Sequence, residues 1–123
     1  MRKLTTLGAR ALWVSSCLFV VACGGAAVPQ EKLTSAQAAI KGAEVAGASE
    51  DPKAALYLKL SREGVDKANA LITESENEHA ARVLDRALAD AELALALANE
   101  ARTKQAANQA KEQAEELKQR IEK

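Results

Sequence analysis

The stretch EHAARVLDRALADAELALALANEARTKQAANQAKEQAEELKQRI, residues 78–121, decides the fold. It contains no glycine or proline, and most of its residues are strong helix formers. From the break at Ser75-Glu76-Asn77 to Ile121 the pattern predicts one helix of about 45 residues, or about 68 Å at 1.5 Å per residue. A helix of this length sets the long dimension of the whole molecule.

Two shorter helices are predicted before it, because the chain carries start and stop signals at suitable places. Thr34 with Gln37 forms a candidate capping box for the first helix, and Gly47 is placed to end it. Asp51 followed by Pro52 is typical of an N-cap and a first helical residue. These residues predict a second helix over about residues 52–74, and Ser75 with Glu78 forms another candidate capping box for the long helix.

Each predicted helix carries an apolar stripe at alternating steps of three and four residues, which is typical of helices that pack together. The stripes comprise Leu33, Ala36, Ile40, Ala43 and Gly47 in the first helix, Ala54, Leu58, Ser61, Val65, Ala68, Ile72 and Ser75 in the second, and Leu84, Leu88, Ala91, Leu95 and Ala98 in the third. Short connections make consecutive helices antiparallel neighbours. The expected fold is therefore all-α, an antiparallel three-helix, hairpin-like bundle with a slender, alanine-rich core.

The long helix is predicted to outrun its neighbours, because the second helix can cover it only to about Glu100. We therefore expect a bundle over residues 33–100 and a protruding, coiled-coil-like half over residues 101–123. The protruding half has an apolar stripe of its own: Ala107, Ala110, Ala114, Leu117 and Ile121. Carried backwards in steps of seven residues, this stripe meets Ala96 and Leu93 rather than Leu95 and Ala98, which indicates a shift of phase along the helix.

Three interpretations of the protruding stripe remain open from the sequence. It could belong to a single water-exposed helix supported by pairs such as Lys111 with Glu115 and Glu116 with Arg120. It could close on a second copy of the chain, or it could dock another protein. Under the second and third interpretations, the candidate interaction residues are Ala107, Ala110, Ala114, Leu117 and Ile121.

The first 22 residues have the pattern of a secretory signal. Arg2, Lys3 and Arg10 precede a mostly apolar run over residues 11–22, which is shorter than the roughly 20 apolar residues that cross a bilayer. The run ends in Val20-Val21-Ala22-Cys23, and these four residues resemble the lipobox of bacterial lipoproteins. The alternatives are an ordinary signal cleavage after Ala22 and an uncleaved anchor, which the shortness of the run and Ser15-Ser16 within it disfavour.

The lipobox resemblance implies cleavage between Ala22 and Cys23 and attachment of a diacylglycerol and a further acyl chain to Cys23. Two or three acyl chains anchor a protein stably to a membrane. Residues 23–32 would then form an acylated N-terminus and tether, since they contain small residues and a proline without periodicity. Gly24 is not the aspartate that retains enterobacterial lipoproteins at the inner membrane, so the resemblance implies the outer membrane, facing the periplasm.

Composition excludes several functional classes. The whole sequence has 17 basic and 17 acidic residues, but residues 23–123 keep only 14 basic residues beside the 17 acidic ones, a net charge of −3, with Tyr57 as the one aromatic. Such a chain has no basic surplus for phosphates and no aromatic platform for bases, so we expect no nucleic-acid binding. It also lacks a catalytic constellation, and His79 has no second histidine or thiol with which to hold a metal. We expect no enzymatic activity, no metal and no cofactor other than the lipid on Cys23.

The body of the chain resembles a family of short bacterial envelope lipoproteins described as domain of unknown function 4398. The similarity lies in residues 36–43 (AQAAIKGA), in Ala48 before Pro52, in residues 60–68 (LSREGVDKA) and in residues 81–91 (ARVLDRALADA). The family often has an aromatic residue where this chain has residues 76–79 (ENEH). The resemblance implies a helical envelope lipoprotein, with OmpA-like peptidoglycan-binding proteins as candidate partners.

These observations favour a membrane-anchored periplasmic lipoprotein with a structural or protein-interaction role. The alternative function is a small-ligand or lipid carrier, in which the helices enclose an apolar groove. Close packing of alanines leaves little room for such a pocket.

Overall fold

The computed structural model describes residues 26–122, which form three helices and no strand. The helices are α1 (Gln30–Val45), α2 (Pro52–Thr73) and α3 (Asn77–Ile121). The predicted all-α fold with a long C-terminal helix is confirmed. The signal segment, the cleavage site and the lipobox Val20, Val21, Ala22 and Cys23 lie outside the described residues.

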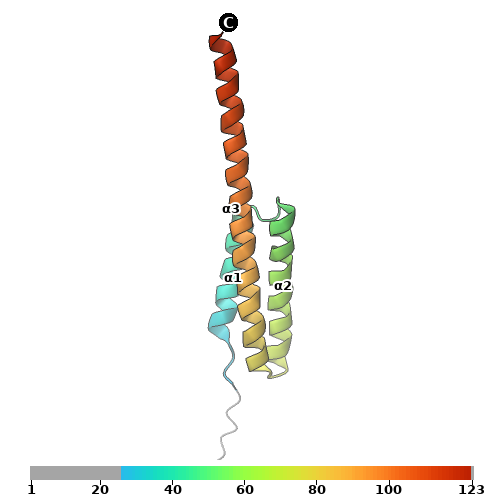
Figure 1. Ribbon diagram of the computed structural model, residues 1–123. Helices are drawn as coiled ribbons and strands as arrows, with labels where there is room; N and C mark the ends of the chain where they lie inside the picture. Colours follow the sequence, from blue (N-terminus) through green and yellow to red (C-terminus); the bar gives the residue numbers. More distant parts are fainter. Residues whose placement is uncertain (1–25, 123) are drawn as a thin grey trace, which may run out of the picture.

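The helices run up, down and up, so consecutive helices are antiparallel and α1 is parallel to α3 (Figure 1). Both α1 and α2 pack against α3, whereas they contact each other much less. We call the end with the α2–α3 turn the base, and the end at Ile121 the tip. The chain enters at the base, where the Asn77 side-chain amide donates a hydrogen bond of 2.6 Å to the Ala26 carbonyl oxygen.

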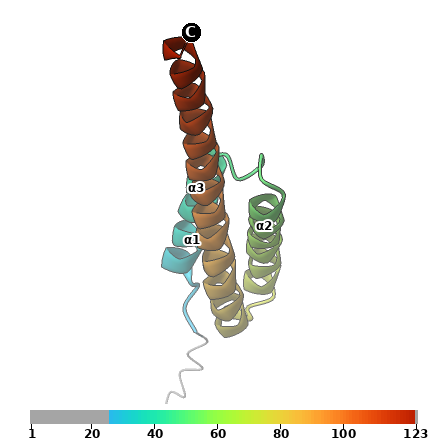
Figure 2. The same ribbon diagram turned by 45° about the horizontal axis from the view of Figure 1, so that its top comes forward.

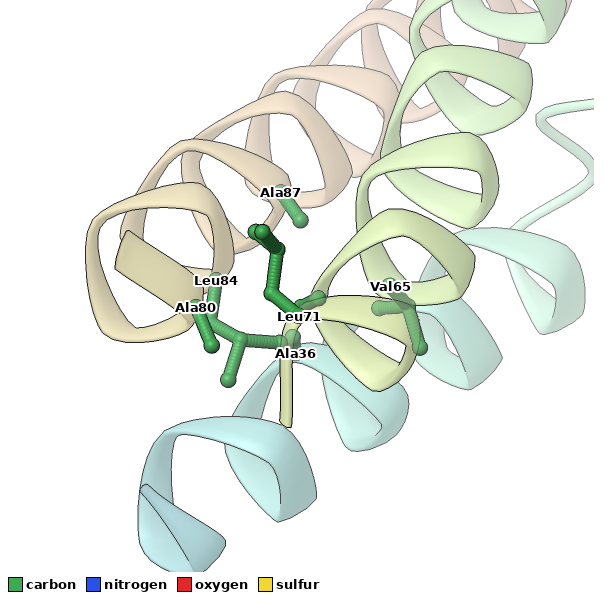
Figure 3. Close-up of a cluster of buried hydrophobic side chains, with 7 residues drawn as sticks. Ala36, Val65, Leu71, Ala80, Leu84 and Ala87 are labelled. Atoms are coloured by element: carbon green, nitrogen blue, oxygen red, sulfur yellow. The ribbon is translucent and has the colours of Figure 1, made fainter. Parts of the chain in front are cut away.

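The core is thin because alanine supplies most of it. Near the base, small residues from all three helices surround Leu84 and Leu71 (Figure 3). Nearer the tip, Leu58 packs among alanines that include Ala43, Ala94 and Ala98. Small side chains let the helix backbones approach closely but bury little apolar surface per residue, so each buried leucine carries a large share of the core's stability.

The closest approach joins α2 to α3 at Ala87. The fully buried Ser61 hydroxyl donates a 2.6 Å hydrogen bond to the Ala87 carbonyl oxygen. One turn further along α2, a β-carbon on Gly64 would lie 2.9 Å from the Ala87 β-carbon. The glycine therefore leaves room for the backbone of α3.

The stripe predicted for the third helix is corrected in part. Leu84, Ala91 and Ala98 are buried, but Leu88 and Leu95 are only half-buried, and Ala80, Ala87 and Ala94 take the central positions. In α2, Leu71 is buried and Ile72 is half-buried. The reason is steric: α1 and α2 contact α3 from two sides, so alanines occupy the lines of closest approach and the larger leucines fill the margins.

The helix ends show which local signals operate. Asp51 caps α2 as predicted, accepting hydrogen bonds from the Lys53 and Ala54 amides at 3.0 and 2.9 Å. Gly47 ends α1 in the left-handed conformation, with φ of 84°. Neither predicted capping box forms. The first fails because α1 already begins at Gln30, within the expected tether, and the Thr34 hydroxyl donates to the Gln30 carbonyl instead. The second fails because Glu76, not Ser75, is the N-cap residue of α3, and no side chain caps it.

Ser75 plays a different role from the predicted N-cap. It has φ of 64° and lies just past the end of α2, where its amide donates to the Ile72 carbonyl and the Glu76 amide donates to the Leu71 carbonyl. This is the Schellman arrangement, in which a left-handed residue satisfies the last carbonyls of a helix. The α2–α3 turn is therefore specified by the end of α2 rather than by the start of α3.

Candidate interaction surface

Packing against α3 stops well before the helix does. Ala98 is the last buried residue, Ala101 is half-buried, and every described side chain from Arg102 onward is exposed. The exposed part to Ile121 is about 30 Å long at 1.5 Å per residue. Figures 1 and 2 show this part of α3 extending alone beyond the ends of α1 and α2.

All five predicted interaction residues lie on this free part, and no other described element covers them. The structure thus exposes Ala107, Ala110, Ala114, Leu117 and Ile121 together along one side of α3. Leu117 is 59% exposed and Ile121 is 86% exposed, although both side chains are large and apolar. An apolar line of this length has no partner within residues 26–122.

The same line continues down the outside of the bundle, through the residues at which the seven-residue spacing indicates a shift of phase. Steps of four and three residues lead from Ala107 through Thr103, Glu100 and Ala96 to Leu93, which is 40% exposed. We call the exposed apolar residues of this line the outer stripe: Ala89, Leu93, Ala96, Ala107, Ala110, Ala114, Leu117 and Ile121. Only Glu100 and Thr103 interrupt it.

The outer stripe lies on the side of α3 opposite to the core. Ala89, Leu93 and Ala96 each come two residues after a core position, and two residues turn an α-helix by about 200°. The phase shift in the sequence therefore does not mark a distortion, because α3 is a continuous helix with two stripes on opposite faces. The seven-residue spacing from Leu93 to Ile121 indicates this second stripe in the sequence. The burial of each residue is needed to show that the two stripes lie on opposite faces of α3.

Charged residues follow the edges of the outer stripe unevenly. We call residues 102–121 the free half of α3 and residues 77–101 its bundled half. One edge of the outer stripe in the free half carries a lysine every seven residues: Lys104, Lys111 and Lys118. In the bundled half the same edge carries Asp90, and the opposite edge carries Asp85. The free half is thus bordered by positive charge, and the bundled half by negative charge.

Ion pairs within the free part are local and exposed. Glu100 accepts a 2.5 Å contact from Lys104, and Glu116 accepts one of 2.6 Å from Arg120, as predicted for the latter pair. The hydrogen bond from Lys104 lowers the pKa of Glu100, and Glu100 raises the pKa of Lys104. Exposed pairs four residues apart support a helix only weakly.

A groove lined by residues of α2 and α3 lies in the lower part of the bundle. It has a volume of about 360 Å³ and is open to solvent. Leu60, Gly64, Val83 and Ala87 form its apolar floor, and charged residues such as Arg82 form its rim. His79 lies at one end, where its Nδ1 is 3.3 Å from a Glu76 carboxylate oxygen.

Residues 26–122 contain neither a metal-binding cluster nor a membrane-spanning helix. Within residues 26–122, no three side chains of the His, Cys, Asp and Glu types are grouped so as to hold a metal ion. None of the helices of this region is both long enough and apolar enough to span a bilayer.

A family model described as domain of unknown function (DUF4398) matches residues 31–110. The chain belongs to the DUF4398 family. The match covers all of the bundle and extends past the last buried residue, Ala98, to include the first part of the free half. Searches of the curated proteins and of the solved structures gave no match.

Proposed function

We propose that this DUF4398 protein is a lipid-anchored lipoprotein of the bacterial envelope, without catalytic activity, whose long helix carries a protein-interaction surface. The observation that carries the proposal is the polarity of the molecule. The described chain begins at the base, where Ala26 contacts Asn77, and the uncovered half of α3 ends at the opposite pole.

The sequence supplies the anchor. Cys23 precedes Ala26 by three residues, so a diacylglycerol on its thiol would hold the molecule by the base. The free half of α3 would then extend from the bundle away from the membrane. The proposed location is the outer membrane, with the protein facing the periplasm. An apolar stripe that a monomer leaves in water is typical of a surface that binds another protein.

The anchor is tested by labelling cells with radioactive palmitate. Cys23→Ser should abolish labelling, because the thiol is the acylation site. Cys17→Ser is the matched control and should be labelled normally, since Cys17 lies inside the apolar run of the signal. Continued labelling of the Cys23→Ser protein would contradict the lipoprotein assignment.

The interaction surface is tested by ending the chain after Glu100. This truncation removes no buried residue, so the bundle should remain anchored and folded while crosslinks to envelope partners, including OmpA-like proteins, disappear. A truncated protein that kept every crosslink would show that the free half is not the interaction element.

The groove between α2 and α3 supports a second candidate, a small-ligand or lipid carrier. Its volume of about 360 Å³ falls at the lower end of the range for ligand pockets. Native mass spectrometry of protein purified from cells would detect a bound molecule. A co-purifying molecule would support a carrier function, whereas a mass equal to that of the polypeptide alone would oppose it.

A further inference from the structure

The outer stripe has two halves that complement each other. In the bundled half, Ala89, Leu93 and Ala96 are exposed on the back of the bundle, and in the free half all five apolar residues are exposed. A helix laid along the stripe would cover both halves. Because the spacing of four and three residues runs unbroken from Ala89 to Ile121, a partner helix can follow the stripe as in a coiled coil.

A parallel pairing of two copies along this stripe meets like charges. In register, Arg86 would face Arg86 and Glu100 would face Glu100, because each occupies a central position of the line. Asp85, on one edge, would lie across from Asp90 on the edge of the other copy. Within each helix Arg86 is 3.9 Å from Asp90 and Glu100 is 2.5 Å from Lys104, but the parallel pairing adds no attractive contact between the two copies at Arg86, Glu100 or Asp85.

An antiparallel pairing brings complementary residues together. We propose that the partner of the outer stripe is a second copy of this chain, with the two α3 helices antiparallel and the free half of each covering the bundled half of the other. In this register Ala107 packs on Ala96, Ala110 on Leu93 and Ala114 on Ala89 of the second copy. Leu117 and Ile121 then lie against the aliphatic stems of Arg86 and Arg82.

The edge charges select this arrangement. Lys111 of the free half lies opposite Asp90 of the second copy, and Arg120 lies opposite Asp85. Symmetry repeats both pairs. Asp85 has 56% of its side chain exposed beside Lys32, so it can exchange partners. Asp90 has only 18% of its side chain exposed and is 3.9 Å from Arg86, so Lys111 would reach it at the margin of the bundle. The stripe of small residues allows the two helices to approach closely.

This inference rests on the proposed function in one respect: it names the partner of the surface proposed there. The pairing itself does not require the lipid on Cys23. It places the two bases, and hence two Cys23 anchors, at opposite ends of the dimer. A pair of copies would therefore hold its lipids apart by the length of α3, lying along one membrane surface or bridging two.

The test uses the chain from residue 24 onward, which keeps the entire buried core and contains no cysteine. Sedimentation over a wide concentration range should give a dimer. Oxidation of a mixture of Ala96→Cys and Ala107→Cys chains should form a disulfide between the two kinds of chain, while Ala107→Cys alone should not crosslink to itself. A monomer at every concentration, or self-crosslinking of Ala107→Cys, would overturn the proposal.

Matched substitutions test the face and the charges. Ala110→Glu on the outer stripe should raise the dimer dissociation constant about tenfold or more, whereas Asn108→Glu, off the stripe, should leave it nearly unchanged. Lys111→Glu should weaken the dimer and Asp90→Lys in the same chain should restore it. Failure of that rescue would exclude this register. A protein that is monomeric but still crosslinks to another envelope protein in cells would exclude a second copy as the partner and leave the proposed function in place.

Discussion

At the scale of single residues, the molecule depends on where side chains are small. Ser61 and Gly64 sit one turn apart on α2 and both face Ala87, which fixes the spacing of α2 and α3. A larger side chain at this level would force the helices apart, because neither Ala87 nor the backbone behind it can turn aside.

Gly64→Ala should therefore destabilise the protein by about 1–3 kcal/mol, even though alanine favours a helix by about 1 kcal/mol relative to glycine. Gly42→Ala is the matched control, since a β-carbon there has no neighbour within 4 Å. That change should instead stabilise by about 0.5–1 kcal/mol. Denaturant unfolding of the two variants measures both effects, and equal behaviour of the two glycines would contradict the proposed close approach.

Ser75 and Gly47, the two residues with positive φ at helix ends, give predictions of opposite sign for the free energy of unfolding. Ser75→Gly should stabilise the protein by about 0.5–1 kcal/mol, because glycine adopts positive φ without steric cost. Gly47→Ala should destabilise it by about 1–2 kcal/mol for the converse reason. Thermal unfolding followed by circular dichroism measures both, and a neutral Ser75→Gly variant would argue against the Schellman arrangement at the end of α2.

At the scale of elements, α1 depends on few contacts with α2, and one of them is electrostatic. Glu44 on α1 accepts a 2.6 Å hydrogen bond from Arg62 on α2 and one of 3.1 Å from Lys41. The Arg62 hydrogen bond, followed by that of Lys41, lowers the pKa of the Glu44 carboxyl. A lowered folded pKa adds stability above the ordinary glutamate value, and this stability is lost as pH falls through the folded pKa.

Arg62→Gln should raise the Glu44 pKa toward its ordinary value and make stability less dependent on pH in the acidic range. Lys41→Gln should have a smaller effect, because Arg62 is the larger cause of the shift. Titration of the Glu44 carboxyl by NMR checks the order, and a larger shift from Lys41→Gln would contradict it.

The three helices could be predicted from the sequence, but their ends and faces could be predicted only in part. Asp51-Pro52 and Gly47 mark their boundaries correctly, because aspartate favours the N-cap, proline favours the first helical position, and glycine adopts positive φ without steric cost. Ser75 was assigned to the start of α3, since a serine followed by an acid three residues later resembles a capping box, although its backbone in fact ends α2. The core face of α3 was partly misplaced because leucine and alanine alternate there, and hydrophobicity alone does not show which of them lies at the closest contact.

The candidate surface was predicted at its free end and missed at its bundled end. Ala107 to Ile121 could be identified because nothing nearby in the sequence could cover them. Leu93 and Ala96 continue the same seven-residue spacing, but from the sequence this continuation is interpreted as a shift of phase. Only the positions of α1 and α2 show that they face outward.

At the scale of the whole molecule, stability and interaction are expected to separate along α3. A chain ending after Glu100 should unfold with a free energy within about 0.5 kcal/mol of the intact protein, because Ala101 is the only removed residue among those described that is even half-buried. This comparison should be made under conditions where the intact protein is monomeric. A large loss of stability in the truncated monomer would mean that the free half contributes to the fold.

The central claim is that the outer stripe is the interaction face of an anchored protein, and photocrosslinking in intact cells tests it most directly. A photoreactive amino acid at position 110, on the stripe, is compared with one at position 108, off the stripe. We predict a specific crosslinked product from position 110, running as a dimer of this chain, and little or none from position 108. Equal crosslinking from both positions, or none from either, would contradict the account.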